Sequence, residues 1–146
     1  MQLTSSAFQD GQAIPRRHTC EGEDVSPPLA WSGLPPGTVS LALIVDDPDA
    51  PGGTFTHWLG WGIDPAAGGL RESERAPRDG RGDFGLTGYR GPCPPRRHGP
   101  HRYFFRLFAL EEELDLRSGA GRSELERALE GAVLARAELV GTYERR

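Results

Sequence analysis

The sequence predicts a mainly β domain with a single helix close to its last strand. Twenty glycines and 13 prolines are spread along most of the 146 residues, which favours many short strands joined by turns. Three short segments rich in β-branched or aromatic residues lie between these turn formers. Only one segment has convincing helical spacing. The length is typical of one compact unit, so we expect a single domain spanning residues 1–146.

The expected core sheet is built from three segments and closed by a fourth. Its strands should span residues 40–46 (SLALIVD), 56–63 (THWLGWGI) and 103–110 (YFFRLFAL). Residues 137–143 (AELVGTY) should form the closing strand. No internal repeat or linker interrupts this order.

The expected helix lies just before that closing strand. Ser123 is positioned to cap its N-terminus, and Glu126 completes the capping box three residues later. Apolar residues then recur at helical spacing, namely Leu125, Ala128, Leu129, Ala132 and Val133.

Composition and charge exclude several classes of function. No apolar run approaches the roughly 18 residues of a membrane span, and the first eight residues lack the pattern of a secretory signal, so we expect a cytoplasmic protein without a transmembrane segment. A net charge of −4 without an arginine stripe argues against nucleic acid as a partner.

Two cysteines are too few for a zinc signature. In a reducing cytosol a structural disulfide between Cys20 and Cys93 is disfavoured, so we expect two thiols. Both cysteines nevertheless lie in Pro/Gly-rich loops that could meet in the fold.

Two segments suit the capture of a small anion. Residues 46–58 and 88–103 each combine a rigid Pro/Gly loop with a histidine at the start of a strand. Backbone N–H groups in such loops form a concave donor surface, and imidazoles add donors and, when protonated, positive charge. Asp47, at the edge of the same site, is suited to fix the tautomer of one imidazole.

The same segments carry a family resemblance. DPDAP at 47–51, HW at 57–58, GYRGPCPP at 88–95 and PHRY at 100–103 resemble the paired ligand-loop motifs of phosphatidylethanolamine-binding proteins, particularly the bacterial Raf-kinase-inhibitor-like branch. The resemblance covers nearly the whole chain, because residues 16–33 (RRHTCEGEDVSPPLAWSG), 82–85 (GDFG) and 140–145 (VGTYER) are also similar to that branch.

The resemblance implies a Greek-key antiparallel β fold with a large and a smaller sheet, and a shallow pocket for a phosphate-like anion or phosphoryl head group. It implies a binding protein rather than an enzyme, with no cofactor or metal, which acts on a protein kinase or protease and forms a homodimer. It also implies a cis bond between Ala50 and Pro51. Carried over by motif, the pocket residues are Asp47, Pro51, His57, Gly91, Pro95, His101 and Tyr103.

Other interpretations stay open. A small hydrolase or lyase would use His57 or His101 as a general base oriented by Asp47, although no serine or threonine lies in a nucleophile elbow. The same three residues form a His/His/carboxylate set of the kind that binds zinc or iron, although the short spacing of known metal motifs is absent.

Smaller expectations complete the picture. Asp47 could equally form an Asx-turn, as could Asp46 or Asp49. Strand alternation should turn Trp58 to the face opposite His57. An anion receptor should bind more tightly as its histidines protonate near about pH 6 to 7, whereas a general base needs a neutral imidazole.

Overall fold

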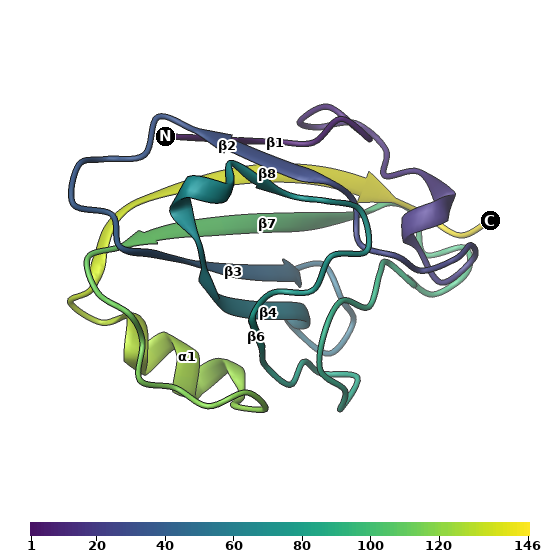
Figure 1. Ribbon diagram of the computed structural model, residues 1–146. Coiled ribbons are helices and arrows are strands. Elements are labelled where there is room, and N and C mark those ends of the chain that lie inside the picture. Colours follow the sequence, from purple (N-terminus) through teal and green to yellow (C-terminus); the bar gives the residue numbers. More distant parts are fainter.

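The structure is a computed structural model that describes all 146 residues. The chain forms three layers, which are a smaller sheet, a larger sheet and one helix (Figure 1). The smaller antiparallel sheet has the order β1 (Gln2–Thr4), β2 (Leu29–Ser32) and β5 (Gly69–Leu70). The larger sheet has the order β6 (Arg78–Asp79), β4 (Phe55–Ile63), β3 (Ser40–Asp47), β7 (His101–Leu110) and β8 (Val133–Tyr143). The helix α1 (Arg122–Leu129) precedes β8, and two 3₁₀ turns, η1 (Arg16–His18) and η2 (Pro65–Ala67), lie in the connections.

This architecture confirms the predicted mainly β fold with one helix before the last strand. Within the larger sheet, the chain leaves β3, forms β4 and β6, and returns to place β7 beside β3. The resulting spatial order, β7-β3-β4-β6, is the fourth-first-second-third order of a Greek key.

The larger sheet is covered on both faces. The face toward the smaller sheet packs Leu41, Leu43 and Val45 of β3 against the layer that contains Leu29 and Trp31. The other face packs Ala42, Ile44, Leu59 and Trp61 against Leu125 and Leu129 of α1. Because β3 is the central strand and is buried along its whole length, successive residues of this strand enter different cores.

The strands match their predicted segments most closely in the centre of the sheet. Strand β3 ends one residue later than expected and β4 begins one residue earlier, whereas β7 begins two residues earlier, at His101. Strand β8 begins at Val133 rather than at residue 137, because its first residues continue the ladder with β7 up to the Leu110↔Val133 pair.

The helix begins before its predicted N-cap. Gly121, in an extended conformation, is the N-cap, and its backbone N–H donates to Glu124 Oε1 at 3.1 Å. Ser123 therefore lies inside the first turn, and the capping glutamate is Glu124 rather than Glu126. The helix ends at Leu129, and Gly131 follows with φ +76°, so Val133 belongs to β8 instead of the helix.

Candidate functional site

Four of the seven predicted site residues come from three strands that meet at one end of the larger sheet (Figure 1), whereas Pro51, Gly91 and Pro95 lie in loops. Asp47 is the last residue of β3, His57 is near the start of β4, and His101 and Tyr103 begin β7. Because β4 and β7 both run antiparallel to β3, its end lies beside their beginnings.

A bulge in β4 gives His57 its position. Val45 pairs with Trp58 and Asp46 pairs with Thr56, so His57 has no partner across the ladder. The bulge cancels the usual alternation: the His57 ring packs edge-on against Tyr103 at 5.3 Å, and Trp58 enters the core that contains Tyr103. The expectation that Trp58 would point to the opposite face from His57 was therefore wrong.

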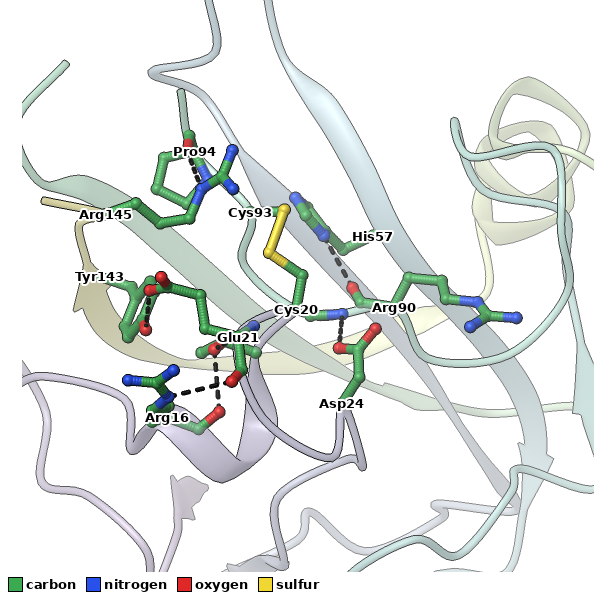
Figure 2. The surroundings of a disulfide bond; sticks show 12 residues. Arg16, Cys20, Glu21, Asp24, His57, Arg90, Cys93, Pro94, Tyr143 and Arg145 are labelled. Carbon is green, nitrogen blue, oxygen red and sulfur yellow. Dashed lines mark hydrogen bonds between the residues drawn. A yellow bond between two sulfur atoms is a disulfide. The ribbon is translucent and has the colours of Figure 1, made fainter. Parts of the chain in front are cut away.

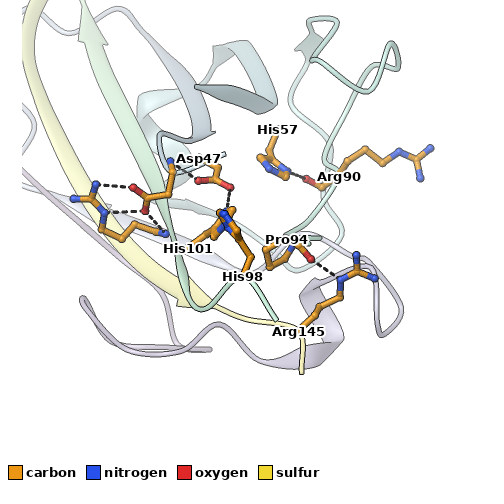
Figure 3. Close-up of polar contacts among 9 residues, drawn as sticks. Asp47, His57, Arg90, Pro94, His98, His101 and Arg145 are labelled. Carbon is orange, nitrogen blue, oxygen red and sulfur yellow. Dashed lines mark hydrogen bonds and ion pairs between the residues drawn. The ribbon is translucent and has the colours of Figure 1, made fainter. Parts of the chain in front are cut away.

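His57 is held by one ring nitrogen (Figure 3). Its Nδ1–H donates to the Arg90 carbonyl oxygen at 2.7 Å, an assignment that follows from the acceptor-only partner and leaves Nε2 without a hydrogen bond. The side chain is 4% exposed, and burial lowers the pKa of its imidazole below the usual value of 6.5. His57 is thus neutral at physiological pH.

Asp47 fixes the second imidazole. Its Oδ2 accepts from His101 Nδ1–H at 2.7 Å, while its Oδ1 accepts from the Asp49 backbone N–H at 2.7 Å. The same side chain therefore forms the Asx-turn and orients the histidine. On the far side of the ring, His101 Nε2 lies 2.6 Å from Nδ1 of the exposed His98 (Figure 3). One of these two nitrogens carries a proton and donates it to the other in a hydrogen bond.

Tyr103 contributes a buried polar group with no partner. The residue is 1% exposed, and its hydroxyl makes no hydrogen bond of normal geometry within the protein, although the Asp47 carboxylate lies nearby. Burial, followed by the nearby charge of Asp47, raises the pKa of this phenol, so the hydroxyl keeps its proton. An unsatisfied buried hydroxyl costs about 1 to 3 kcal/mol, which a hydrogen-bonding ligand or water would recover.

These side chains surround a cavity of about 210 Å³, which we call the histidine cavity. Six of the seven predicted residues line it, namely Asp47, Pro51, His57, Pro95, His101 and Tyr103. Phe55, Phe84, Cys93 and Pro94 also line it. The largest hollow of the surface, about 890 Å³ along residues 67–74, contains no buried titratable side chain.

The bond before Pro51 is trans, as are all others in the chain, so the expected cis bond was wrong.

Gly91, the seventh predicted residue, does not line the cavity. Its backbone N–H donates to Asp24 Oδ1 at 2.8 Å, and a Cβ at this position would lie 2.0 Å from the His18 carbonyl oxygen. Glycine is therefore required here because the loop 88–95 packs against the segment around η1, and its role is structural.

A disulfide joins the same two segments (Figure 2). Cys20 and Cys93 are bonded, with their Cα atoms 5.4 Å apart, and the Cys20 N–H donates to the Pro92 carbonyl oxygen at 3.1 Å. The expectation of two free thiols was wrong, because it was based on the expected compartment rather than on loop proximity. Cys93 also lines the histidine cavity, so the bridge fixes one of its walls.

Sequence reasoning missed several contributors to the site. Arg145, close to the chain's end, donates from Nε to the Pro94 carbonyl oxygen at 2.7 Å (Figure 3). Its own carbonyl accepts from the Arg97 N–H. Phe84 packs its ring against His57 at 5.4 Å. Phe84 lies in the GDFG segment and Arg145 lies in the VGTYER segment. The family resemblance of these two segments was the signal in the sequence that could have identified both residues.

Two further features of the structure concern a metal site, which the sequence left open, and a membrane-spanning segment, which it did not predict. No group of three His, Cys, Asp or Glu side chains is arranged to hold a metal ion. No helix is long and apolar enough to cross a membrane.

Comparison with known proteins agrees with this fold. Residues 4–144 match the family model described as phosphatidylethanolamine-binding protein. A UPF0098 protein of Methanothermobacter thermautotrophicus is 50% identical over 152 residues, covering 99% of both chains. A UPF0098 protein of Pyrococcus horikoshii is 49% identical and covers 97% of this chain and 76% of its own.

Solved structures give the same result. The crystal structure of a candidate phosphatidylethanolamine-binding protein homologue, CT736 of Chlamydia trachomatis, is 39% identical with a TM-score of 0.94 and covers 99% of this chain and 97% of that one. YbcL of E. coli, described as a member of the mammalian family, is 33% identical with a TM-score of 0.92 and covers 99% and 98%. The chain belongs to the phosphatidylethanolamine-binding protein family.

Proposed function

We propose that the histidine cavity binds a small phosphate-like anion or a phosphoryl head group. The observation that carries this proposal is the Tyr103 hydroxyl, a buried donor without a partner in a cavity that also presents two imidazoles. Phosphate oxygens are strong acceptors, and the Tyr103 hydroxyl together with Nε2–H of a protonated His57 would donate to one such oxyanion.

The size of the cavity limits the ligand. About 210 Å³ is smaller than the roughly 300 Å³ at which pockets for drug-sized ligands begin. A phosphate or a short phosphoryl ester fits, whereas the acyl chains of a phospholipid would remain outside. The apolar rim of Pro51, Phe55 and Phe84 suits the first methylene groups of such an ester.

The protonation of His57 determines how binding depends on pH. Because Nδ1–H is already committed to Arg90, Nε2 donates to an anion only after the ring gains a second proton. Burial lowers the pKa of this imidazole, so the gain of affinity occurs below the ordinary histidine pKa and at lower pH than the sequence suggested. A bound anion raises the same pKa by linkage.

Calorimetric titration of inorganic phosphate and phosphoethanolamine tests the proposal. Binding should be stronger at about pH 5.5 than at about pH 8 and should disappear in the His57→Ala/His101→Ala variant. Tyr103→Phe preserves the shape of the ring, so its affinity loss of about tenfold would report the hydroxyl alone. Equal binding by wild type and both variants would refute the anion site.

A finer role follows from the family. We propose that the cavity recognises a phosphorylated or acidic segment of a protein kinase or protease and thereby modulates it. The resemblance of the ligand loops to the Raf-kinase-inhibitor-like branch motivates this role, and the phosphate-sized cavity supports it. A phosphopeptide that competes with phosphate in the calorimeter would support the proposal, whereas a phosphopeptide that leaves phosphate binding unchanged would contradict it.

An enzymatic role is the second candidate, favoured by the Asp47–His101 hydrogen bond, which is the orientation a general base needs. A hydrolase of this kind would turn over p-nitrophenyl phosphate, and His101→Ala would abolish the turnover. If the purified protein does not turn over p-nitrophenyl phosphate, anion binding remains the proposed function.

The compartment and the assembly remain predictions. A cytoplasmic location is compatible with the Cys20–Cys93 disulfide only in a cell that preserves intracellular disulfides, and a Mycobacterium tuberculosis relative, 42% identical, is named as a candidate lipoprotein. Thiol alkylation in intact cells distinguishes a bridged from a reduced cysteine pair. Sedimentation analysis tests the expected homodimer.

A further inference from the structure

A second polar cavity lies on the other face of the larger sheet. It encloses about 370 Å³ beneath α1, and we call it the arginine cavity after Arg106, Arg122 and Arg136 in its wall. Ile44, Phe108 and Leu129 supply its apolar surface. The cavity lies on the α1 face of the sheet, because Ile44, Phe108 and Leu129 belong to the core under α1. Tyr103 of the histidine cavity belongs to the core that faces the smaller sheet.

Asp46 presents an unmet acceptor in this cavity. The residue is 1% exposed, and its Oδ2 accepts from Arg106 Nη1 at 2.6 Å and from Arg122 Nη1 at 2.7 Å. Its Oδ1 is buried and has no hydrogen-bond partner. A buried carboxylate oxygen normally accepts a hydrogen bond, and the protein provides no donor for this one.

Arg136 presents an unpaired cation in the same wall. Glu138 faces Arg106 Nε at 3.2 Å and Glu126 faces Arg122 Nε at 3.5 Å, so those two arginines have their own carboxylates. Arg136 lies on β8 opposite Phe108, and its guanidinium makes no hydrogen bond or ion pair within the protein. It is exposed, and its guanidinium is available to an anion.

The sheet register sets the separation of these two features. Asp46 pairs with Phe104, which pairs with Val140, and Arg136 lies four residues before Val140 on β8. Four residues of strand span about 14 Å, and the two strand spacings from β3 to β8 add about 10 Å sideways, so the Cα atoms of Asp46 and Arg136 lie roughly 17 Å apart; the arginine side chain shortens this gap. The two groups therefore address opposite ends of one elongated molecule that would pass over Arg106 and lie against Phe108 at its Arg136 end.

The chemistry at the Asp46 end selects hydroxyl groups. A group there must donate to Oδ1 while lying beside the guanidinium groups of Arg106 and Arg122, which repel an ammonium ion. A hydroxyl donates to the carboxylate and accepts from an arginine at the same time. The far end requires an anion, which Arg136 can bind through two parallel N–H groups.

We propose that the arginine cavity binds a phosphorylated sugar, with sugar hydroxyls at Asp46, the apolar face of the ring against Phe108 and Leu129, and the phosphate at Arg136. The cavity volume lies within the range of small-molecule sites, which begins at roughly 300 Å³. This site is independent of the histidine cavity, because no residue lines both.

Titration of glucose 6-phosphate into the whole protein tests the assignment. Binding should persist in the His57→Ala/His101→Ala variant and weaken about tenfold in Arg136→Gln, which removes one charged hydrogen-bonding group from an exposed, unpaired position. Arg127→Gln, on α1 outside the cavity lining, is the matched control and should bind as wild type does.

Two further arms make the result decisive. Hexyl phosphate, which has no hydroxyls along its chain, should bind at least about tenfold more weakly than glucose 6-phosphate if Asp46 reads hydroxyl groups. Loss of glucose 6-phosphate binding in the double histidine variant would place it in the histidine cavity and overturn the proposal. Binding unchanged in Arg136→Gln, or no binding at millimolar concentration, would overturn it as well.

Discussion

Asp46 and Asp47 are neighbours in the chain but belong to different sites, because β3 turns them to opposite faces of the larger sheet. Asp47 hydrogen-bonds the imidazole of His101 and the backbone of Asp49, whereas Asp46 pairs with two arginines, whose charges are permanent. The comparison shows that one type of side chain orients a histidine on one face and anchors a fixed ionic network on the other.

The largest expected effect is on the histidine side. Replacing both bridged cysteines by alanine should lower the free energy of unfolding by about 4 kcal/mol, because the bridge closes a loop between residues 73 positions apart. Phosphate binding should weaken with it, since Cys93 lines the histidine cavity. Urea unfolding measures the stability, and wild type treated with reductant is the control. Unchanged stability would show that the hydrogen bonds around Gly91 suffice without the bridge.

Asp46→Ala should be the next most damaging change. It leaves Arg106 and Arg122 facing each other without the buried carboxylate, at a cost of about 3 kcal/mol in the free energy of unfolding. Phosphate affinity measured by calorimetry should stay at the wild-type level, because the histidine cavity lies on the other face. A matching loss of phosphate binding would show that the two faces are coupled.

Asp47→Asn should affect phosphate affinity more than stability, which is the reverse of the effect expected for Asp46→Ala. The neutral amide weakens the hydrogen bond that orients the His101 ring, so phosphate affinity at about pH 5.5 should fall about tenfold. The stability loss should be smaller than for Asp46→Ala, at about 1 kcal/mol, because only hydrogen bonds are weakened. If stability fell while phosphate affinity did not, Asp47 would have only a structural role.

The smallest effect should come from His98→Ala. His98 occupies Nε2 of His101, and its removal frees that nitrogen for the anion, so phosphate affinity should rise by a factor of about two to five. Arg96→Ala, on the same exposed loop but without contact to His101, serves as the control. A decrease in affinity would mean that His98 itself binds the anion.

The sequence predicted the central strands well because β3, β4 and β7 are buried and their patterns leave little choice. The pocket residues followed from motifs in two loops, and six of the seven line one cavity. The sequence could not show the bulge at His57, since a bulge depends on the register with β3. The arginine cavity was missed for a similar reason, because its arginines come from β7, α1 and β8 and meet only in the folded chain.

The hydrogen bonds that join Arg145 to Pro94 and Arg97 have a practical consequence for handling the protein. A purification tag fused after Arg146 would emerge beside the mouth of the histidine cavity, where a polyhistidine tail would compete with the ligand. A tag placed before Met1 would emerge toward the other end of the molecule (Figure 1). Surface immobilisation through the N-terminus should therefore keep the cavity open, and immobilisation through the C-terminus should hide it.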